Sequence, residues 1–194
     1  MYSAVLSTLL LSSTLYCLDI ESGGRLSGLQ SAIDVEHYKI DLRVDPYKQV
    51  IAGEVTIRFK LLQKVDRVEL DLLDRYVVSG TAIDGMVLSH THRNNKLFIA
   101  NPGIDLFVAH ELRIKYGGKP PTAKNPPWDG GFTWSKDIEG RHWVGVSCQS
   151  NGAHVWYPCK EHPSDKVDGA DIIITVPDPL MVVSNGVLIS SEKQ

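Results

Sequence analysis

Apolar and polar side chains alternate along several segments of this chain, and this period of two constrains the fold more than any other feature. From Tyr38 to Val44 every second residue is apolar, while Lys39, Asp41 and Arg43 between them are charged. Successive side chains of a β-strand point to opposite faces, so this pattern predicts a strand with one buried face. The same alternation recurs over residues 53–60, 67–72 and 111–116.

Later segments extend the β pattern. The apolar run over 170–176 is more continuous and predicts a central strand. Ser184-Asn-Gly186 stands between the apolar segments 181–183 and 187–189, which predicts a hairpin. No window of similar length shows an apolar stripe with helical spacing and caps. We therefore predict an all-β fold, an antiparallel saddle-like β-sandwich with few or no helices.

Length and charge bound the class of protein. The chain has 194 residues, enough for one globular domain, and its 43% apolar and 22% charged residues argue against disorder. The net charge is −3, and Lys and Arg are scattered along the chain. We expect no nucleic-acid partner, because no basic cluster alternates with aromatic residues.

The first 18 residues differ from the rest. They are rich in Leu, Ser and Thr and carry no charged side chain, which favours a signal peptide or anchor over residues 1–18, followed by a connector over 19–34. We therefore expect a secreted, periplasmic or envelope-associated protein. The alternatives are a buried apolar strand or helix, or a lipid anchor at Cys17, although Tyr16 is large for the latter.

The segment from Ser147 to Pro163 concentrates two Cys, two His, two Pro and a Trp-Tyr pair. It resembles the loop that ends the N-terminal domain of zinc aminopeptidases related to aminopeptidase N and leukotriene hydrolase, bacterial branch. The residues that carry this resemblance are Gln149, Tyr157, Pro158, Cys159, Glu161 and Pro163. Further similarity lies over 126–134, 175–177 and 183–186, and the similar region runs from about Val35 to the C-terminus. His154 and His162 stand where many members have an Arg and an acidic residue.

The resemblance implies that residues 35–194 are the N-terminal β domain of such a peptidase, forming one wall of its peptide-binding cleft. It also implies that Gln149 contacts the N-terminal residue of the peptide substrate, with Ser150 and Asn151 as weaker candidates at the rim. The implied cofactor of the whole enzyme is zinc, and the implied partner is a C-terminal catalytic domain. We expect this chain alone to be inactive, with no catalytic or metal-binding residues, because His-Glu-x-x-His is absent from it.

Other chemistry is weakly supported. Cys148, Cys159, His154 and His162 contain only one short-spaced pair, whereas structural zinc sites commonly use two. Cys148 could act as a nucleophile with His142 or His154, but no orienting third group accompanies them, and a buried thiol is favoured. Cys148 and Cys159 could also form a disulfide. Free thiols are favoured, because the resemblance implies a buried packing residue at Cys159.

A Pro- and Gly-rich loop over 115–131 interrupts the strands. We expect Trp128, Phe132 and Trp134 to anchor it to the sheet, and direct substrate contact is the alternative. The same aromatic loop supports a competing function, a stand-alone secreted β-sandwich module that binds carbohydrate or protein.

Overall fold

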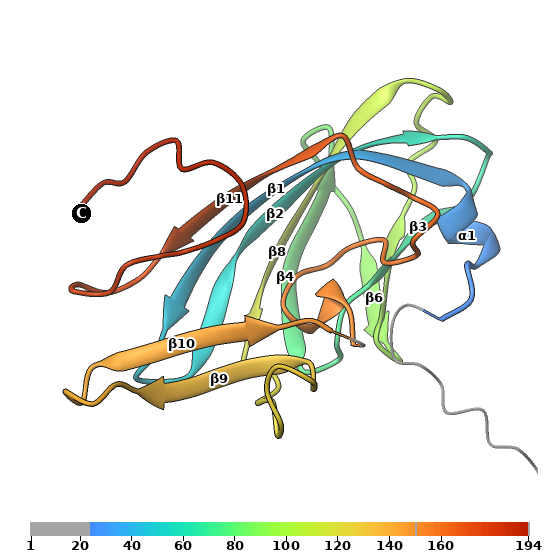
Figure 1. Cartoon of the computed structure of the whole chain (residues 1–194). Helices are drawn as coiled ribbons and strands as arrows, with labels where there is room; N and C mark the ends of the chain where they lie inside the picture. Colours follow the sequence, from blue (N-terminus) through green and yellow to red (C-terminus); the bar gives the residue numbers. More distant parts are fainter. Residues whose placement is uncertain (1–23, 150, 194) are drawn as a thin grey trace, which may run out of the picture.

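Three β-sheets form the framework of the domain (Figure 1). This computed structural model describes residues 24–149 and 151–193. The helical elements are α1 (Gly28–Ser31) and the 3₁₀ helix η1 (Ala153–Val155). The strands are β1 (Ile33–Asp45), β2 (Val50–Leu61), β3 (Arg67–Asp71), β4 (Tyr76–Ile83), β5 (Met86–Val87), β6 (His90–Arg93), β7 (Lys96–Ala100), β8 (Ala109–Gly118), β9 (Gly131–Lys136), β10 (His142–Ser147) and β11 (Gly169–Thr175). The predicted all-β class is confirmed.

The largest sheet has six strands in the order β11-β1-β2-β8-β4-β5. A three-stranded sheet, β3-β7-β6, lies against it, and β9 and β10 form a separate hairpin (Figure 1). The strand pairs are antiparallel except that β11 runs parallel to β1. The alternating segments 38–44, 53–60 and 111–116 thus become the long strands β1, β2 and β8 of the large sheet, and segment 67–72 becomes β3 of the three-stranded sheet.

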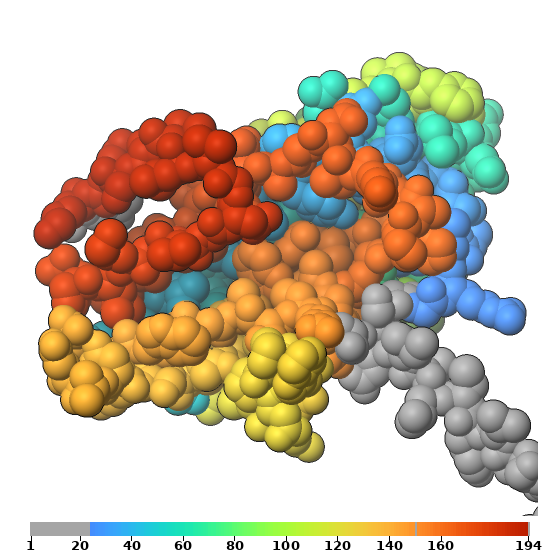
Figure 2. All heavy atoms as spheres, in the orientation of Figure 1, coloured from blue at the N-terminus to red at the C-terminus, as the bar shows by residue number. Residues whose placement is uncertain are grey.

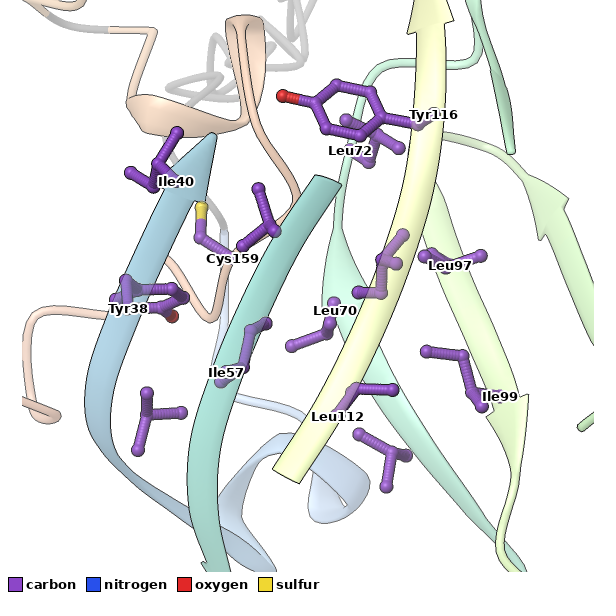
Figure 3. Packing of buried hydrophobic residues seen from close by; sticks show 14 of the residues in the cluster. Tyr38, Ile40, Ile57, Leu70, Leu72, Leu97, Ile99, Leu112, Tyr116 and Cys159 are labelled. Atoms are coloured by element: carbon purple, nitrogen blue, oxygen red, sulfur yellow. The ribbon is translucent and has the colours of Figure 1, made fainter. Parts of the chain in front are cut away.

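The hydrophobic core lies between the large sheet and the three-stranded sheet. Figure 3 shows side chains of β1, β2 and β8, among them Ile40, Ile57 and Leu112, facing Leu97 and other residues of the smaller sheet. These four side chains are at most 2% exposed. Burying one large aliphatic side chain stabilises a fold by roughly 1.5–3 kcal/mol, so the period-two pattern supplies the main driving force for this packing.

Two expectations about the C-terminal part are wrong. The strand β11 lies at the edge of the large sheet and not at its centre, and Ile173 on it is 42% exposed. Residues 181–189 form no hairpin, and Met181, Val183 and Ile189 are at least 90% exposed. A turn sequence stabilises a hairpin only when the flanking apolar residues find a surface to cover, and the described residues offer none here.

The described residues before β1 include the short helix α1. Ser27 caps α1 by accepting a hydrogen bond from the backbone N–H of Gln30, whose side chain is fully buried. Residues 1–18, the predicted leader, lie outside the described residues. Within the described part of the chain, no helix is long and apolar enough to span a membrane.

His110, at the start of β8, bonds to two different loops, one at Asp84 and one at Asp105. Its Nδ1 lies 2.6 Å from a carboxylate oxygen of Asp84, and its Nε2 lies 3.0 Å from the backbone carbonyl of Asp105. Both ring nitrogens therefore face acceptors, an arrangement that the imidazolium form satisfies fully. Burial opposes this charge, but the bonds to Asp84 and Asp105 outweigh it and raise the pKa of His110 above 6.5.

This pair makes stability depend on pH. A raised pKa in the folded state means that the contribution of His110 is complete below pH 6.5 and is lost as the pH rises through the folded pKa. We expect the free energy of unfolding of the parent to fall over that range more than that of His110→Gln, measured by urea titration at several pH values. The control His162→Gln alters a surface histidine bonded to Ser164 and should follow the parent. Parallel pH curves for parent and His110→Gln would contradict this role.

Candidate functional site

Residues 148–163, here called the candidate loop, follow β10 along the chain and lie in orange between β10 and β3 in Figure 1. The loop opens with a tight turn, because the backbone N–H of Gly152 donates to the carbonyl of Cys148 at 2.8 Å. It then passes through η1 and joins the strand β3, where Cys159 and Asp71 exchange two backbone hydrogen bonds of 2.7 and 3.0 Å. The loop is thus fixed at both ends.

Tyrosine hydroxyls from the large sheet hold the middle of the loop. Tyr76 donates to the carbonyl of Val155 at 2.5 Å, and Tyr116 donates to the carbonyl of Trp156 at 2.6 Å. Burial raises the pKa of both Tyr76 and Tyr116, so these hydroxyls stay protonated and remain donors. Nearby, the hydroxyl of Tyr38 accepts a bond of 3.0 Å from a backbone N–H of the loop. The sequence alternation predicted Tyr38 and Tyr116 as core residues but gave no signal of this second role, and it did not include Tyr76.

A buried ionic cluster fixes the far end of the loop. One carboxylate oxygen of Asp71 accepts hydrogen bonds from the side chain of Gln30 at 2.7 Å and from the backbone N–H of Glu161 at 3.2 Å. The other oxygen pairs with the ammonium group of Lys96, which also lies 3.5 Å from Glu69. Burial opposes the charge of Lys96, but Asp71 and Glu69 outweigh it and raise its pKa. The alternation had predicted Glu69 and Asp71 on a solvated face, yet both are buried.

His154 and Glu161 form a second buried pair inside the loop. The Nδ1 atom of His154 bonds to a carboxylate oxygen of Glu161, and both side chains are less than 10% exposed. The carboxylate packs against Gly152, where a Cβ atom would lie 1.6 Å from the nearer oxygen. His154 therefore provides a buried partner for the carboxylate of Glu161.

The fit between Gly152 and Glu161 can be tested by adding one methyl group. Gly152→Ala places a side chain at φ 86° and ψ 177°, a region essentially restricted to glycine, which costs about 1–3 kcal/mol, and adds overpacking of roughly 1–3 kcal/mol against the carboxylate. Gly140→Ala is the matched control, because Gly140 has a φ of 81° but nothing within 4 Å of its Cβ position. Thermal unfolding should show a clearly larger loss for Gly152→Ala. Equal losses would mean that the carboxylate moves aside freely.

Of the three predicted substrate-binding residues, Gln149 is exposed in the turn that follows β10. Ser150 lies outside the described residues. The Oδ1 atom of Asn151 accepts a bond of 2.6 Å from the backbone N–H of Gly130, so this side chain joins the candidate loop to the Pro- and Gly-rich loop. A Cβ on Gly130 would clash with Asn151, at 2.3 Å. The structure therefore gives Asn151 a tethering contact beside the exposed Gln149.

The aromatic residues before β10 divide into two groups. Phe132 is buried and stacks on Trp134 with ring centroids 5.2 Å apart, as expected of anchors. Trp128 is 68% exposed, so the expectation that it anchors the loop is wrong. Hydrogen bonds between Asn125 and Asp129 close the turn locally and leave the indole outside.

Both cysteines of the loop are free thiols in the structure. Cys159 is buried in the core, and burial raises its pKa well above 9.0, which makes it a poor nucleophile. Burial also raises the pKa of Cys148, which is partly exposed. Across residues 24–149 and 151–193, no group of three or more Cys, His, Asp or Glu side chains could hold a metal ion.

Comparison with known proteins decides the family. The family model of the peptidase M1 N-terminal domain matches residues 34–194. The chain belongs to this family. The M1 membership explains the resemblance seen in the sequence, including the Pro158-Cys159 segment that pairs with β3. A search of the curated proteins found no match.

Solved M1 peptidases share the fold. An M1 zinc metallopeptidase from Deinococcus radiodurans, in a mutant form bound to a Tyr-Ser-Ala substrate, matches with a TM-score of 0.71 and 23% identity over 91% of this chain. Native yeast LTA4 hydrolase matches with a TM-score of 0.65 and 25% identity over 84% of this chain. This M1 domain spans 40% and 25% of the length of those two chains, respectively.

In the orientation of Figure 1, the surface of the M1 domain is hollowed beside β10. Figure 2 shows a recess between the C-terminal segment, drawn in red, and β10, drawn in orange, and a separate gap enclosed by the red segment itself. Residues 177–193 add several exposed apolar side chains at the border of this recess. The domain thus presents an open, partly apolar face next to the strand that leads to Gln149.

Proposed function

We propose that this M1 domain forms one wall of the peptide-binding cleft of a zinc aminopeptidase, and that Gln149 binds the amino terminus of the substrate. The observation that carries the proposal is the exposed Gln149 on a turn closed by the Gly152–Cys148 hydrogen bond and joined to Gly130 by Asn151. A side-chain amide accepts through its oxygen and donates through its nitrogen without carrying charge. It can therefore bind a substrate ammonium group and a neighbouring backbone group together.

The rigidity of the candidate loop supports this role. Gln149 directly follows Cys148, whose carbonyl accepts the hydrogen bond that closes the turn. Two residues later, Asn151 is bonded to Gly130, so the backbone is held on both sides of Gln149. Holding a substrate end in a fixed position removes part of the entropy cost of the reaction. A fixed amino terminus also limits cleavage to the first peptide bond.

The zinc and the catalytic groups belong to another domain in this proposal. None of the described residues fits a zinc site, and His-Glu-x-x-His is absent from all 194 residues. The partner is therefore a catalytic domain that supplies the metal and packs beside the candidate loop. Export to the cell envelope or medium is also part of the proposal and depends on the leader at residues 1–18.

The test compares the chain with the polypeptide that carries it together with a zinc domain. We expect the 194-residue chain to release no product from aminoacyl reporter substrates and to bind less than about 0.1 zinc per chain. The larger polypeptide should cleave the same reporters, and a chelator should abolish this activity. About one zinc per 194-residue chain would contradict the proposal. A reading frame that ends after Gln194, with no zinc domain in any other polypeptide, would instead favour a binding module.

A further inference from the structure

The outer face of the three-stranded sheet carries a second, polar hollow. Its volume is about 350 Å³, and β3, β6 and β7 contribute its walls together with residues that flank β3 and β6. None of the lining residues belongs to the candidate loop. A hollow of this size is within the range of small-molecule sites.

Strand register brings basic and hydroxyl side chains around one aromatic ring. Thr91 on β6 stands opposite Phe98 on the central strand β7, and Arg93 follows on the same face of β6. From the other side, the guanidinium of Arg67 lies 5.2 Å from the centroid of the Phe98 ring. The hydroxyl of Ser89 lies at the same hollow.

Most of these polar groups have no partner of their own. Among the described residues, Arg93 forms no ion pair, and the hydroxyls of Ser89 and Thr91 form no hydrogen bond. Arg67 is 3.9 Å from Asp66, whose side chain is 79% exposed, and such a surface pair contributes little. Two arginines and two hydroxyls are thus available as donors to one ligand.

The acidic residues of β3 nearby are buried, and Lys96 balances one of their two negative charges. Glu69 and Asp71 lie on the same face of β3, but their carboxylates are buried and bonded to Lys96, Gln30 and Ser27. Asp66 is therefore the one exposed carboxylate at the hollow, against two guanidinium groups. Arginine presents a planar set of donors that matches an oxyanion in a bidentate way.

We propose that this hollow binds a small ligand through a phosphate or sulfate group. Arg67 and Arg93 bind the oxyanion from two sides, and Thr91 and Ser89 donate to its remaining oxygens. Phe98 forms the apolar floor and keeps Arg67 in place. The volume allows an attached body of about the size of one sugar ring.

The test is a titration of the whole chain in low-salt buffer, by calorimetry, with glucose 6-phosphate, inorganic phosphate and glucose. We expect saturable binding of glucose 6-phosphate with a Kd of about 1 mM or lower, and none of glucose. Tighter binding of glucose 6-phosphate than of phosphate would show that the sugar body also contributes. Equal binding would limit recognition to the anion, and either result supports the site.

Arg93→Ala should weaken the binding of glucose 6-phosphate at least about tenfold, because one charged donor is lost from the anion. The matched control is Arg43→Ala, an exposed arginine on β1 in the other sheet that has no ion pair among the described residues. It should bind like the parent. No saturation up to about 10 mM ligand, or equal weakening in both variants, overturns the proposal. Circular dichroism of Arg93→Ala verifies that the variant is folded.

Discussion

We expect Gln149→Ala to lower kcat/KM for peptides with a free amino terminus by about 10–150-fold, which corresponds to the loss of a hydrogen bond to a charged group, about 1.5–3 kcal/mol. The free energy of unfolding stays close to that of the parent, because the side chain is exposed in its turn. The measurement is steady-state hydrolysis of aminoacyl reporters and short peptides by the polypeptide that includes the zinc domain.

Gln63→Ala is the matched control for this experiment. Gln63 is also exposed in a loop, between β2 and β3, and should leave kcat/KM unchanged. A loss of activity that is specific to Gln149 supports direct contact with the substrate. Equal kinetics for Gln149→Ala and the parent would remove the proposed role of this residue.

Asp71→Ala is expected to have the largest effect on stability. The side chain of Asp71 is 3% exposed and holds the ammonium of Lys96, the amide of Gln30 and the backbone N–H of Glu161. Breaking one side of a buried ion pair costs about 3–5 kcal/mol, because the remaining charge is left buried without its partner. Denaturant titration followed by tryptophan fluorescence measures this loss.

Asp66→Ala serves as the control, because Asp66 is an exposed carboxylate just before β3. Its loss of unfolding free energy should stay within about 0.5 kcal/mol. The triple variant Glu69→Gln/Asp71→Asn/Lys96→Met removes all three charges of the cluster and should recover part of the stability, since no charge is then buried alone. If Asp71→Ala unfolds at the same denaturant concentration as the parent, the cluster does not fix the candidate loop.

Much of the fold could be predicted from local pattern. Alternation in residues 35–44 and 111–116 is a direct consequence of burying one face of a strand, and the observed burial of Ile40 and Leu112 follows it. The pattern failed where tertiary neighbours decide the outcome. Asp71 alternates like a surface residue, but α1 and the candidate loop cover it, and neither neighbour can be predicted from β3 itself.

The position of β11 shows the same limit. Its apolar run predicted a central strand, and the structure places it at the sheet edge, where the apolar Ile173 is exposed. The sequence pattern indicates that a strand has an apolar face. It does not indicate whether another element packs against that face. The candidate loop was identified by its resemblance to a family, whereas the tyrosine and Asp71 contacts that hold it required the structure.

The most direct measurement is a crystal structure of the polypeptide that carries both this domain and its zinc domain, with a bound peptide. Our account predicts that the side-chain oxygen of Gln149 lies about 2.7–3.2 Å from the amino nitrogen of the peptide, within hydrogen-bond distance. A peptide bound in the cleft with its amino terminus more than about 6 Å from Gln149, too far for even one bridging water, would contradict the account.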